Sequence, residues 1–249
     1  MTGLEPILVF DSGVGGFSIL KELQSILPHD YLYLADQAYF PYGDKDPSWV
    51  RSRIETLVEY GIKEGVSAIV IACNTATVHS IADLREKYHL PIFGVEPVIK
   101  PLANYQHAGL LATVSTANSP RVRELMREHL GEHLAIIGVH GLAAAIEDMD
   151  QDEITRILTK LNTRLSGIEA LGLSCTHYPL AKSLIKSLYP NITLIDPSTA
   201  VAEHIKKMLG ANGGKVPTTR FVTTGNVLRL EDQILHYLGA RTKVTQVEL

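Results

Sequence analysis

The sequence predicts an α/β fold with two similar α/β domains, each with a mainly parallel sheet, and a functional site in the cleft between them. The 249 residues, 45% of them hydrophobic, are enough for one large core or two modest ones. Short apolar runs alternate with segments of helical periodicity along the chain. The two cysteines, Cys73 and Cys175, each follow such a run, one in each half.

The first half alternates strands with helices. An apolar strand over 6–10 ends at the glycine-rich turn 11–16, and apolar residues at helical spacing follow it. A second strand is predicted over 31–35. A polar loop then leads to a helix that carries Ile54, Leu57, Val58 and Ile62 on one face. The strand before Cys73, a helix and a strand within 91–97 complete this half.

The second half repeats this alternation. Its predicted strands span 109–113, 134–138, 168–174 and 192–195. Helices are expected from Ser119-Pro120, around Glu147, from about Asp152, after Cys175 and through 201–209. The glycine-rich segment 210–215 predicts a linker, and a strand over 220–224 and a helix over 228–238 follow it. The first domain is therefore expected to comprise 1–97 plus 211–249, and the second 98–210.

Cys73 follows a buried apolar strand and precedes small hydrogen-bonding residues. Asn74 and Thr75 are expected to cap the next helix. The carboxyl ends of parallel strands are where α/β sheets bind ligands, and a helix amino terminus there favours anions and thiolates. Cys175 has a similar setting. A free cysteine is often only a small buried hydrophobe, but the repeated setting favours a functional pair.

Two thiols across a cleft suit few kinds of chemistry. A zinc site needs three or four ligands, and only Cys175 and His177 lie close in sequence. A redox pair is usually a Cys-x-x-Cys motif, although a spatial pair stays open. A Cys–His nucleophile would leave Cys73 unused. An enzyme that inverts a stereocentre needs a base on one face of a carbon and an acid on the other, which two equal thiols provide.

Composition excludes several partners. The formal charge is −4, from 23 basic and 27 acidic residues, so neither nucleic acid nor an acidic membrane surface is expected as a partner. No apolar run approaches the roughly 18 residues of a spanning helix, and the amino terminus lacks a signal-peptide pattern. The sequence thus predicts a cytoplasmic protein with free thiols.

The turn Gly13-Val14-Gly15-Gly16 partly resembles a nucleotide-binding fingerprint. It lacks the third spaced glycine and the Lys-Ser/Thr pair of a phosphate loop. A tight turn that brings the backbone close to another group is the favoured interpretation. Asp11 and Ser12, at the strand end, are candidates for contacting a small ligand, with helix capping as the alternative.

Four motifs occur in the order typical of glutamate racemases, within the wider aspartate/glutamate racemase group. They are Asp11-Ser12-Gly13-Val14-Gly15-Gly16, Pro41-Tyr42-Gly43, Ala72-Cys73-Asn74-Thr75-Ala76 and Cys175-Thr176-His177-Tyr178-Pro179-Leu180. The chain resembles this family over nearly its whole length. The resemblance implies a racemase without metal or cofactor, with two domains facing each other across the site. Its substrate would be glutamate, and its product D-glutamate would supply peptidoglycan.

The resemblance also implies roles for single residues. Cys73 resembles the acid/base for D-glutamate and Cys175 the one for L-glutamate, with Asp11 assisting the first thiol and His177 and Glu147 the second. The positions matching substrate-binding residues are Asp11, Ser12, Tyr42, Gly43, Asn74, Thr75, Thr116, Thr176 and His177. None of the matched motifs contains Arg or Lys, so hydroxyls, backbone N–H groups and helix amino termini are expected to hold the carboxylates.

The chain departs from the family pattern before Glu147 and before Cys175. Residues 140–146 read His-Gly-Leu-Ala-Ala-Ala-Ile where the family tends to have Cys-Pro and bulky apolar residues, and Ser174 stands where glycine is usual. The alternatives are a racemase of another acidic amino acid, such as aspartate, and a two-lobed binding protein whose cysteines merely pack. The sequence leaves a homodimer open without indicating its interface.

Overall fold

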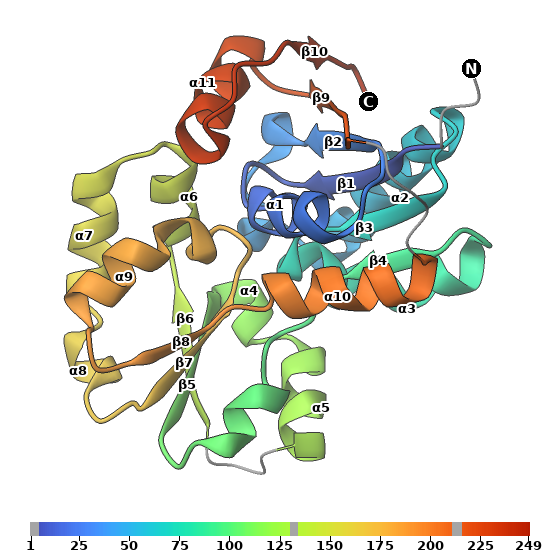
Figure 1. Cartoon of the computed structure of the whole chain (residues 1–249). Helices are drawn as coiled ribbons and strands as arrows, with labels where there is room; N and C mark the ends of the chain where they lie inside the picture. The colour runs from blue at the N-terminus through green and yellow to red at the C-terminus, as the bar shows by residue number, and fades with distance from the viewer. Residues whose placement is uncertain (1–4, 130–133, 211–215) are drawn as a thin grey trace.

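The computed structural model describes residues 5–129, 134–210 and 216–249, which form two parallel sheets, each in its own α/β domain (Figure 1). The first sheet has the strand order β10-β9-β2-β1-β3-β4 and the second β6-β5-β7-β8. The strands are β1 (Ile7–Asp11), β2 (Tyr31–Ala35), β3 (Ala68–Ile71), β4 (Ile92–Gly94), β5 (Ala108–Thr113), β6 (Leu134–Val139), β7 (Ala170–Ser174), β8 (Thr193–Ile195), β9 (Thr219–Thr223) and β10 (Val244–Gln246).

Helices cover the faces of both sheets. They are α1 (Phe17–Ile26), α2 (Pro47–Lys63), α3 (Asn74–Lys87), α4 (Val114–Ala117), α5 (Pro120–His129), α6 (Leu142–Glu147), α7 (Gln151–Thr159), α8 (Asn162–Leu165), α9 (Lys182–Leu188), α10 (Ser198–Leu209) and α11 (Val227–Leu238). Four short 3-10 helices complete the described elements: η1 (Gln37–Tyr39), η2 (Tyr42–Asp44), η3 (Lys100–Asn104) and η4 (Tyr178–Ala181).

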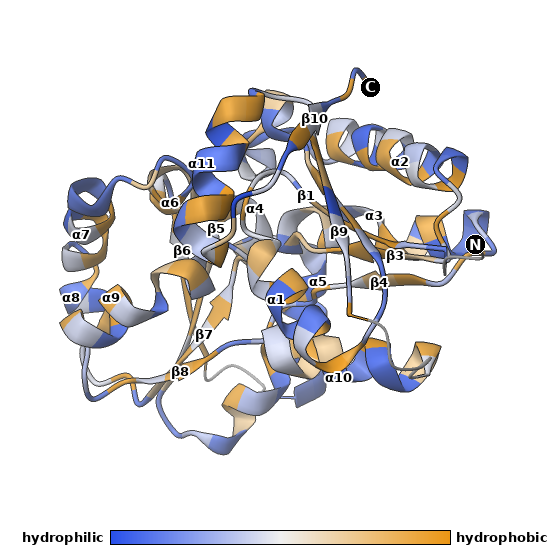
Figure 2. Ribbon diagram, turned by 45° about the horizontal axis from the view of Figure 1, so that its top comes forward, coloured by the Kyte–Doolittle hydropathy of each residue, from blue (hydrophilic) through white to orange (hydrophobic). Residues whose placement is uncertain are grey.

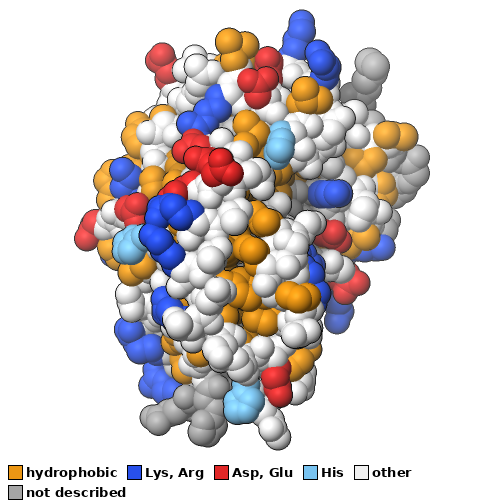
Figure 3. All heavy atoms as spheres, turned by 90° about the vertical axis from the view of Figure 1, so that its left-hand side faces the viewer, with side chains coloured by type: hydrophobic (Ala, Val, Ile, Leu, Met, Phe, Trp, Pro, Cys, Tyr) orange, Lys and Arg blue, Asp and Glu red, His pale blue; other side chains and the backbone are white. Residues whose placement is uncertain are grey.

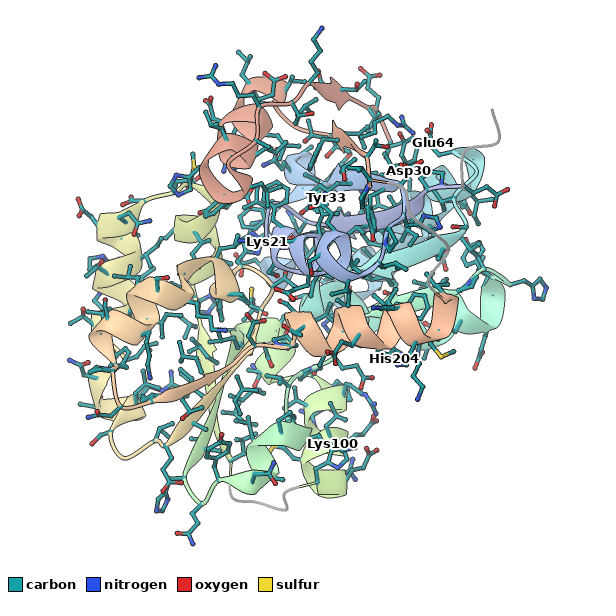
Figure 4. All side chains as sticks on the ribbon, in the orientation of Figure 1. Lys21, Asp30, Tyr33, Glu64, Lys100 and His204 are labelled. Carbon is teal, nitrogen blue, oxygen red and sulfur yellow. The ribbon has the colours of Figure 1, made fainter. Side chains whose placement is uncertain are left out.

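The first sheet is buried on both faces. Along β1, Ile7 and Val9 join the core under α1, α10 and α11, while Leu8 and Phe10 join the core under α2 and α3. This is the alternation that the strand geometry requires, and the central strands are accordingly hydrophobic (Figure 2). Tyr33 of β2, labelled in Figure 4, packs on the α1 side, 4.8 Å from the ring of Phe17.

The second sheet is smaller but also covered on both sides. Leu111, Leu171 and Leu173 pack toward α6, α7 and α9, and Leu110 and Ala170 pack toward α5 and η3. All pairings of both sheets are parallel. The carboxyl ends of the strands therefore gather at one edge of each sheet.

The predicted two-domain α/β fold is confirmed, and the predicted strands are present, shifted or shortened by up to about four residues. The sequence pattern missed the short elements α4, α8 and β10. Most of the predicted linker, residues 211–215, lies outside the described residues.

The predicted division into 1–97 plus 211–249 and 98–210 stays a prediction. The packing of α10 favours moving that helix into the first domain. Its Ala202 and Ile205 join the core of the first sheet, and its His204 (labelled in Figure 4) lies 6.0 Å from the Phe93 ring of β4. The loop that precedes α10 then forms a second crossing between the domains.

The surface carries mixed charge. The face in Figure 3 shows acidic and basic side chains together, with apolar side chains between them. Among the described residues, no helix has the length and apolar character that crossing a membrane requires.

Candidate active site between the two domains

Both cysteines lie at carboxyl ends of strands, one in each domain. Cys73 follows β3 and is the N-cap residue of α3, and Cys175 follows β7. Both are free thiols, each only 6% exposed, and both line one cavity between the domains. The cavity is therefore flanked by a thiol from each sheet.

The cavity contains most of the predicted substrate-binding residues. Those that line it, beside the two predicted catalytic cysteines, are Ser12, Tyr42, Gly43, Asn74, Thr75, Thr176 and His177. The sequence reasoning missed further lining residues, namely Phe40, Pro41, Asp44, Thr113, Val114, Val139, His140, Gly141, Ala143 and Ala144. Thr113 could have been found, because it ends the predicted strand 109–113. The lining contains no Lys or Arg, as the motifs indicated.

Asp11, Thr116 and Glu147 lie behind the cavity wall, where each contacts residues that line it. Thr116 is fully buried, and its hydroxyl lies 3.1 Å from that of Thr75. A direct contact of Asp11 and Thr116 with substrate stays a prediction, as does the catalytic role of Glu147.

Asp11 of the first domain links the two domains through a hydrogen bond with Thr176 of the second. Its carboxylate accepts a hydrogen bond from the Thr176 hydroxyl at 2.7 Å and another from the Gly13 N–H at 2.8 Å. Burial raises the pKa of Asp11, and the nearby positive charge of His177 offsets only part of that shift. Burial, followed by the charge of Asp11, also raises the pKa of Cys73 well above its usual value. The resting Cys73 is therefore a neutral thiol, able to give up a proton.

Beside Cys175, a buried pair joins His177 to Glu147. His177 Nε2 lies 2.8 Å from Glu147 Oε2, and the His177 side chain lines the same cavity as Cys175. Burial lowers the pKa of His177, but hydrogen bonds with Cys175 and Glu147 and the charge of Asp11 raise it well above its ordinary value. Burial raises the pKa of Glu147, but the bond and charge of His177 and the Val14 N–H lower it overall. The pair is thus an imidazolium beside a carboxylate.

The glycine-rich turn receives these side chains from the other domain. The Val14 N–H donates to Glu147 Oε2 at 2.8 Å. A Cβ on Gly13 would lie 2.2 Å from Glu147 Oε2, and a Cβ on Gly15 would lie 2.4 Å from His177 Nδ1. Since real Cβ atoms do not come so close to other atoms, a larger residue at either position would displace these side chains. The turn brings backbone close to a carboxylate and an imidazole of the second domain.

Asn74 and Thr75 do not cap α3, contrary to the sequence-based expectation. Cys73 is the N-cap residue and makes no side-chain capping bond. Asn74 is already helical, and its Nδ2 donates to the Val95 carbonyl at 2.8 Å while its buried Oδ1 has no partner among the described residues. The Thr75 hydroxyl instead lies 3.2 Å from that of Thr113 in the other domain. Both side chains therefore face neighbours and the cavity rather than the helix end.

Tyr42 is held by a buried ion pair that the sequence reasoning did not identify. Its hydroxyl donates to Asp36 Oδ2 at 2.5 Å, and Arg53 donates to both oxygens of Asp36 at 2.8 and 2.6 Å. Thr224 adds a further bond to Asp36 Oδ1. Asp36 is fully buried and Arg53 is 7% exposed, so the carboxylate depends on these donors. The ion pair fixes one wall of the cavity.

We expect Arg53→Met to lower the free energy of unfolding by about 3–5 kcal/mol, because it leaves the buried Asp36 carboxylate without its cation. Urea denaturation followed by circular dichroism measures this. The double variant Asp36→Leu/Arg53→Met should lose less than Arg53→Met alone, since no uncompensated charge remains. Equal or greater loss in the double variant would show that the ion pair is not what stabilises this wall.

The described residues contain no group of three or more His, Cys, Asp and Glu side chains arranged to hold a metal ion. Fold and site together define a two-domain α/β protein whose cavity is lined by two buried thiols, one from each domain, and by no Lys or Arg side chain.

Comparison with known proteins assigns this arrangement to a family. The family model for Asp/Glu/hydantoin racemases matches residues 18–205, and the chain belongs to this family. The glutamate racemase of Cupriavidus pinatubonensis is 37% identical over 259 aligned positions, covering 98% of this chain and 95% of that protein.

Solved structures show the same likeness. The crystal structure of a glutamate racemase from Bacillus anthracis is similar with a TM-score of 0.84 and 30% identity, covering 98% of each chain. The Escherichia coli glutamate racemase, solved with L-glutamate and the activator UDP-MurNAc-Ala, gives a TM-score of 0.83 at 28% identity, again covering 98% of each chain.

Proposed function

We propose that the protein interconverts L- and D-glutamate by proton transfer at Cα between two thiols. The observation that carries this proposal is the pair of buried free cysteines, one from each domain, lining a single cavity. The likeness to glutamate racemases, including one solved with L-glutamate, supports glutamate as substrate.

In the L-to-D direction, the Cys175 thiolate takes the Cα proton and the Cys73 thiol delivers its own proton to the opposite face. The electron pair of the broken C–H bond stays at Cα until it forms the new one. Protonated His177, which lines the cavity with Cys175, stabilises the thiolate that starts this direction. The D-to-L direction uses the same steps in reverse, with Cys73 as the base and Asp11 as its neighbouring acid/base.

Neutral groups would hold the substrate. The unpaired Asn74 Oδ1 is a suitable acceptor for the α-ammonium group, next to Cys73. Hydroxyls of Ser12 and Thr75 and the N–H groups at the start of α3 are available to the carboxylates, whereas the Thr176 hydroxyl, which also lines the cavity, donates to Asp11. Without lysine or arginine in the lining, the thiols lie in a site with little fixed positive charge other than His177.

The test is to incubate the purified protein with L-glutamate in ²H₂O, after removing metal ions and pyridoxal phosphate. Circular dichroism should show loss of optical activity, and proton NMR should show one deuterium at Cα of the D-glutamate formed. L-aspartate serves as the comparison substrate. If neither amino acid exchanges or inverts, the two-lobed binding protein is the better interpretation. Faster inversion of aspartate than of glutamate would identify aspartate as the substrate.

This activity would supply D-glutamate for peptidoglycan, and it would need no cofactor, since the two thiols provide both the base and the acid. The cytoplasmic location and a homodimer stay predictions.

A further inference from the structure

Helix α11 of the first domain contacts the helix that carries Glu147. Its Leu230 and Ile234 pack in the core of the first sheet, while the Gln233 side chain reaches Glu147 of α6. Gln233 is fully buried, and its Nε2 donates to the Glu147 carbonyl at 2.5 Å and to Glu147 Oε1 at 3.2 Å. In Figure 1, α11 lies next to α6, across the boundary between the domains.

Gln37 reaches the same carboxylate from η1, which follows β2. Its Nε2 donates to Glu147 Oε1 at 2.6 Å and to Gln233 Oε1 at 2.7 Å. Its own Oε1 lies 3.1 Å from the Thr223 hydroxyl, which also lies 3.0 Å from the Ala35 carbonyl. The two glutamines and Thr223 therefore form one chain of hydrogen bonds that ends on Glu147.

These contacts complete the hydrogen bonding of the Glu147 carboxylate. Oε1 accepts from Gln37 and Gln233, and Oε2 accepts from the Val14 N–H and lies 2.8 Å from His177 Nε2. An ionised carboxylate has about four lone-pair sites, and each has a donor here. Three of the four donors belong to the first domain, whereas His177 belongs to the second. The orientation of His177 therefore depends on the other domain.

We propose that Gln37 and Gln233 are positioning residues for racemisation, which hold Glu147 as the ionised acceptor that orients His177 against Cys175. The proposal rests on the two-thiol function proposed above. It assigns to α11 and η1 a role in catalysis that none of the sequence motifs contains, since both glutamines lie outside all four. It also implies that the second thiol is ready to react only when the two domains are docked.

The test replaces each amide with an apolar side chain of similar length, Gln37→Met and Gln233→Met. Each variant should lose about ten- to a hundredfold in kcat with little change in KM, because a hydrogen bond to a charged group is removed without touching the cavity. The acid limb of the kcat/KM profile should move to higher pH, since Glu147 then takes up a proton more easily. Other charged or titratable groups near this carboxylate are Asp11, Tyr33, Asp148, Cys175, His177, Arg229 and Tyr237.

A second readout needs no activity. In protein labelled with ¹⁵N-histidine, the wild-type His177 ring should stay protonated to higher pH than in either variant. Tyr237→Phe is the matched control, because the Tyr237 hydroxyl bonds the Ile146 carbonyl on the same α11–α6 contact without touching Glu147. It should leave the pH profile and the His177 signal in place.

The outcomes separate the two proposals. A wild type that does not racemise would refute the proposed function, and the histidine titration would still decide the role of the glutamines. If Gln37→Met and Gln233→Met match Tyr237→Phe in kcat, in the pH profile and in the His177 titration, the positioning role of the two glutamines is overturned. Gln37 is only partly buried, so if Gln233→Met fails to fold, Gln37→Met decides alone.

Discussion

Cys73→Ala and Cys175→Ala are each expected to lower racemisation by about 10³-fold or more, because each removes the only acid/base on one face of Cα. In ²H₂O the two variants should differ in which enantiomer exchanges its Cα proton. Cys73→Ala keeps the Cys175 thiolate beside His177 and should exchange L-glutamate without inverting it. Cys175→Ala should exchange only D-glutamate. Chiral chromatography combined with proton NMR measures inversion and exchange in the same sample.

Ser174→Ala is the control for these variants. Ser174 immediately precedes Cys175, and its hydroxyl accepts a hydrogen bond from the Val98 N–H rather than lining the cavity. The variant is expected to lose about 1–3 kcal/mol of stability but to keep its exchange and inversion rates. Near-normal racemisation by either cysteine variant would eliminate the two-thiol mechanism. If one variant exchanged both enantiomers, a mechanism with one thiol on each face of Cα would be excluded.

Much of this architecture follows from local pattern. Short apolar runs predicted the strands because parallel strands buried on both faces are hydrophobic throughout. The same pattern placed Cys73 and Cys175 at strand ends, where the structure has them. The short strand β10 was missed because Val244–Gln246 has too few residues to show a period.

The network around Glu147 could not be derived in this way. Gln37 and Gln233 are 196 residues apart in the chain, and Val14 and Glu147 are 133 apart. Nothing in a local pattern connects residues so distant in the chain, and Val14 and Glu147 also lie in different domains. Asn74 gives another example. Asparagine prefers helix caps, but here its side chain donates instead to the Val95 carbonyl, a tertiary contact that local sequence does not reveal. Sequence patterns thus predicted the positions of the reacting groups but not the contacts that control them.

Gly13→Ala is expected to reduce kcat by about 10²-fold, with a much smaller effect on the stability of the first domain. The backbone at Gly13 is not in the left-handed region, so alanine is not strained there. Its Cβ would instead lie 2.2 Å from Glu147 Oε2, which must move away and take His177 with it. A displacement of about 1 Å in a catalytic array costs about two orders of magnitude. Steady-state kinetics and thermal unfolding, measured together, separate the two effects.

Shortening the opposing side chain should relieve this clash. In Gly13→Ala/Glu147→Asp the carboxylate is one methylene further from the new methyl group, so the double variant should be more active than the product of the two single effects predicts. Gly15→Ala provides the matched comparison. Its Cβ would meet His177 Nδ1 at 2.4 Å and Thr176 Oγ1 at 2.7 Å, so Glu147→Asp should not rescue it. Rescue of both glycine variants, or of neither, would mean that the turn does not position Glu147 by direct contact.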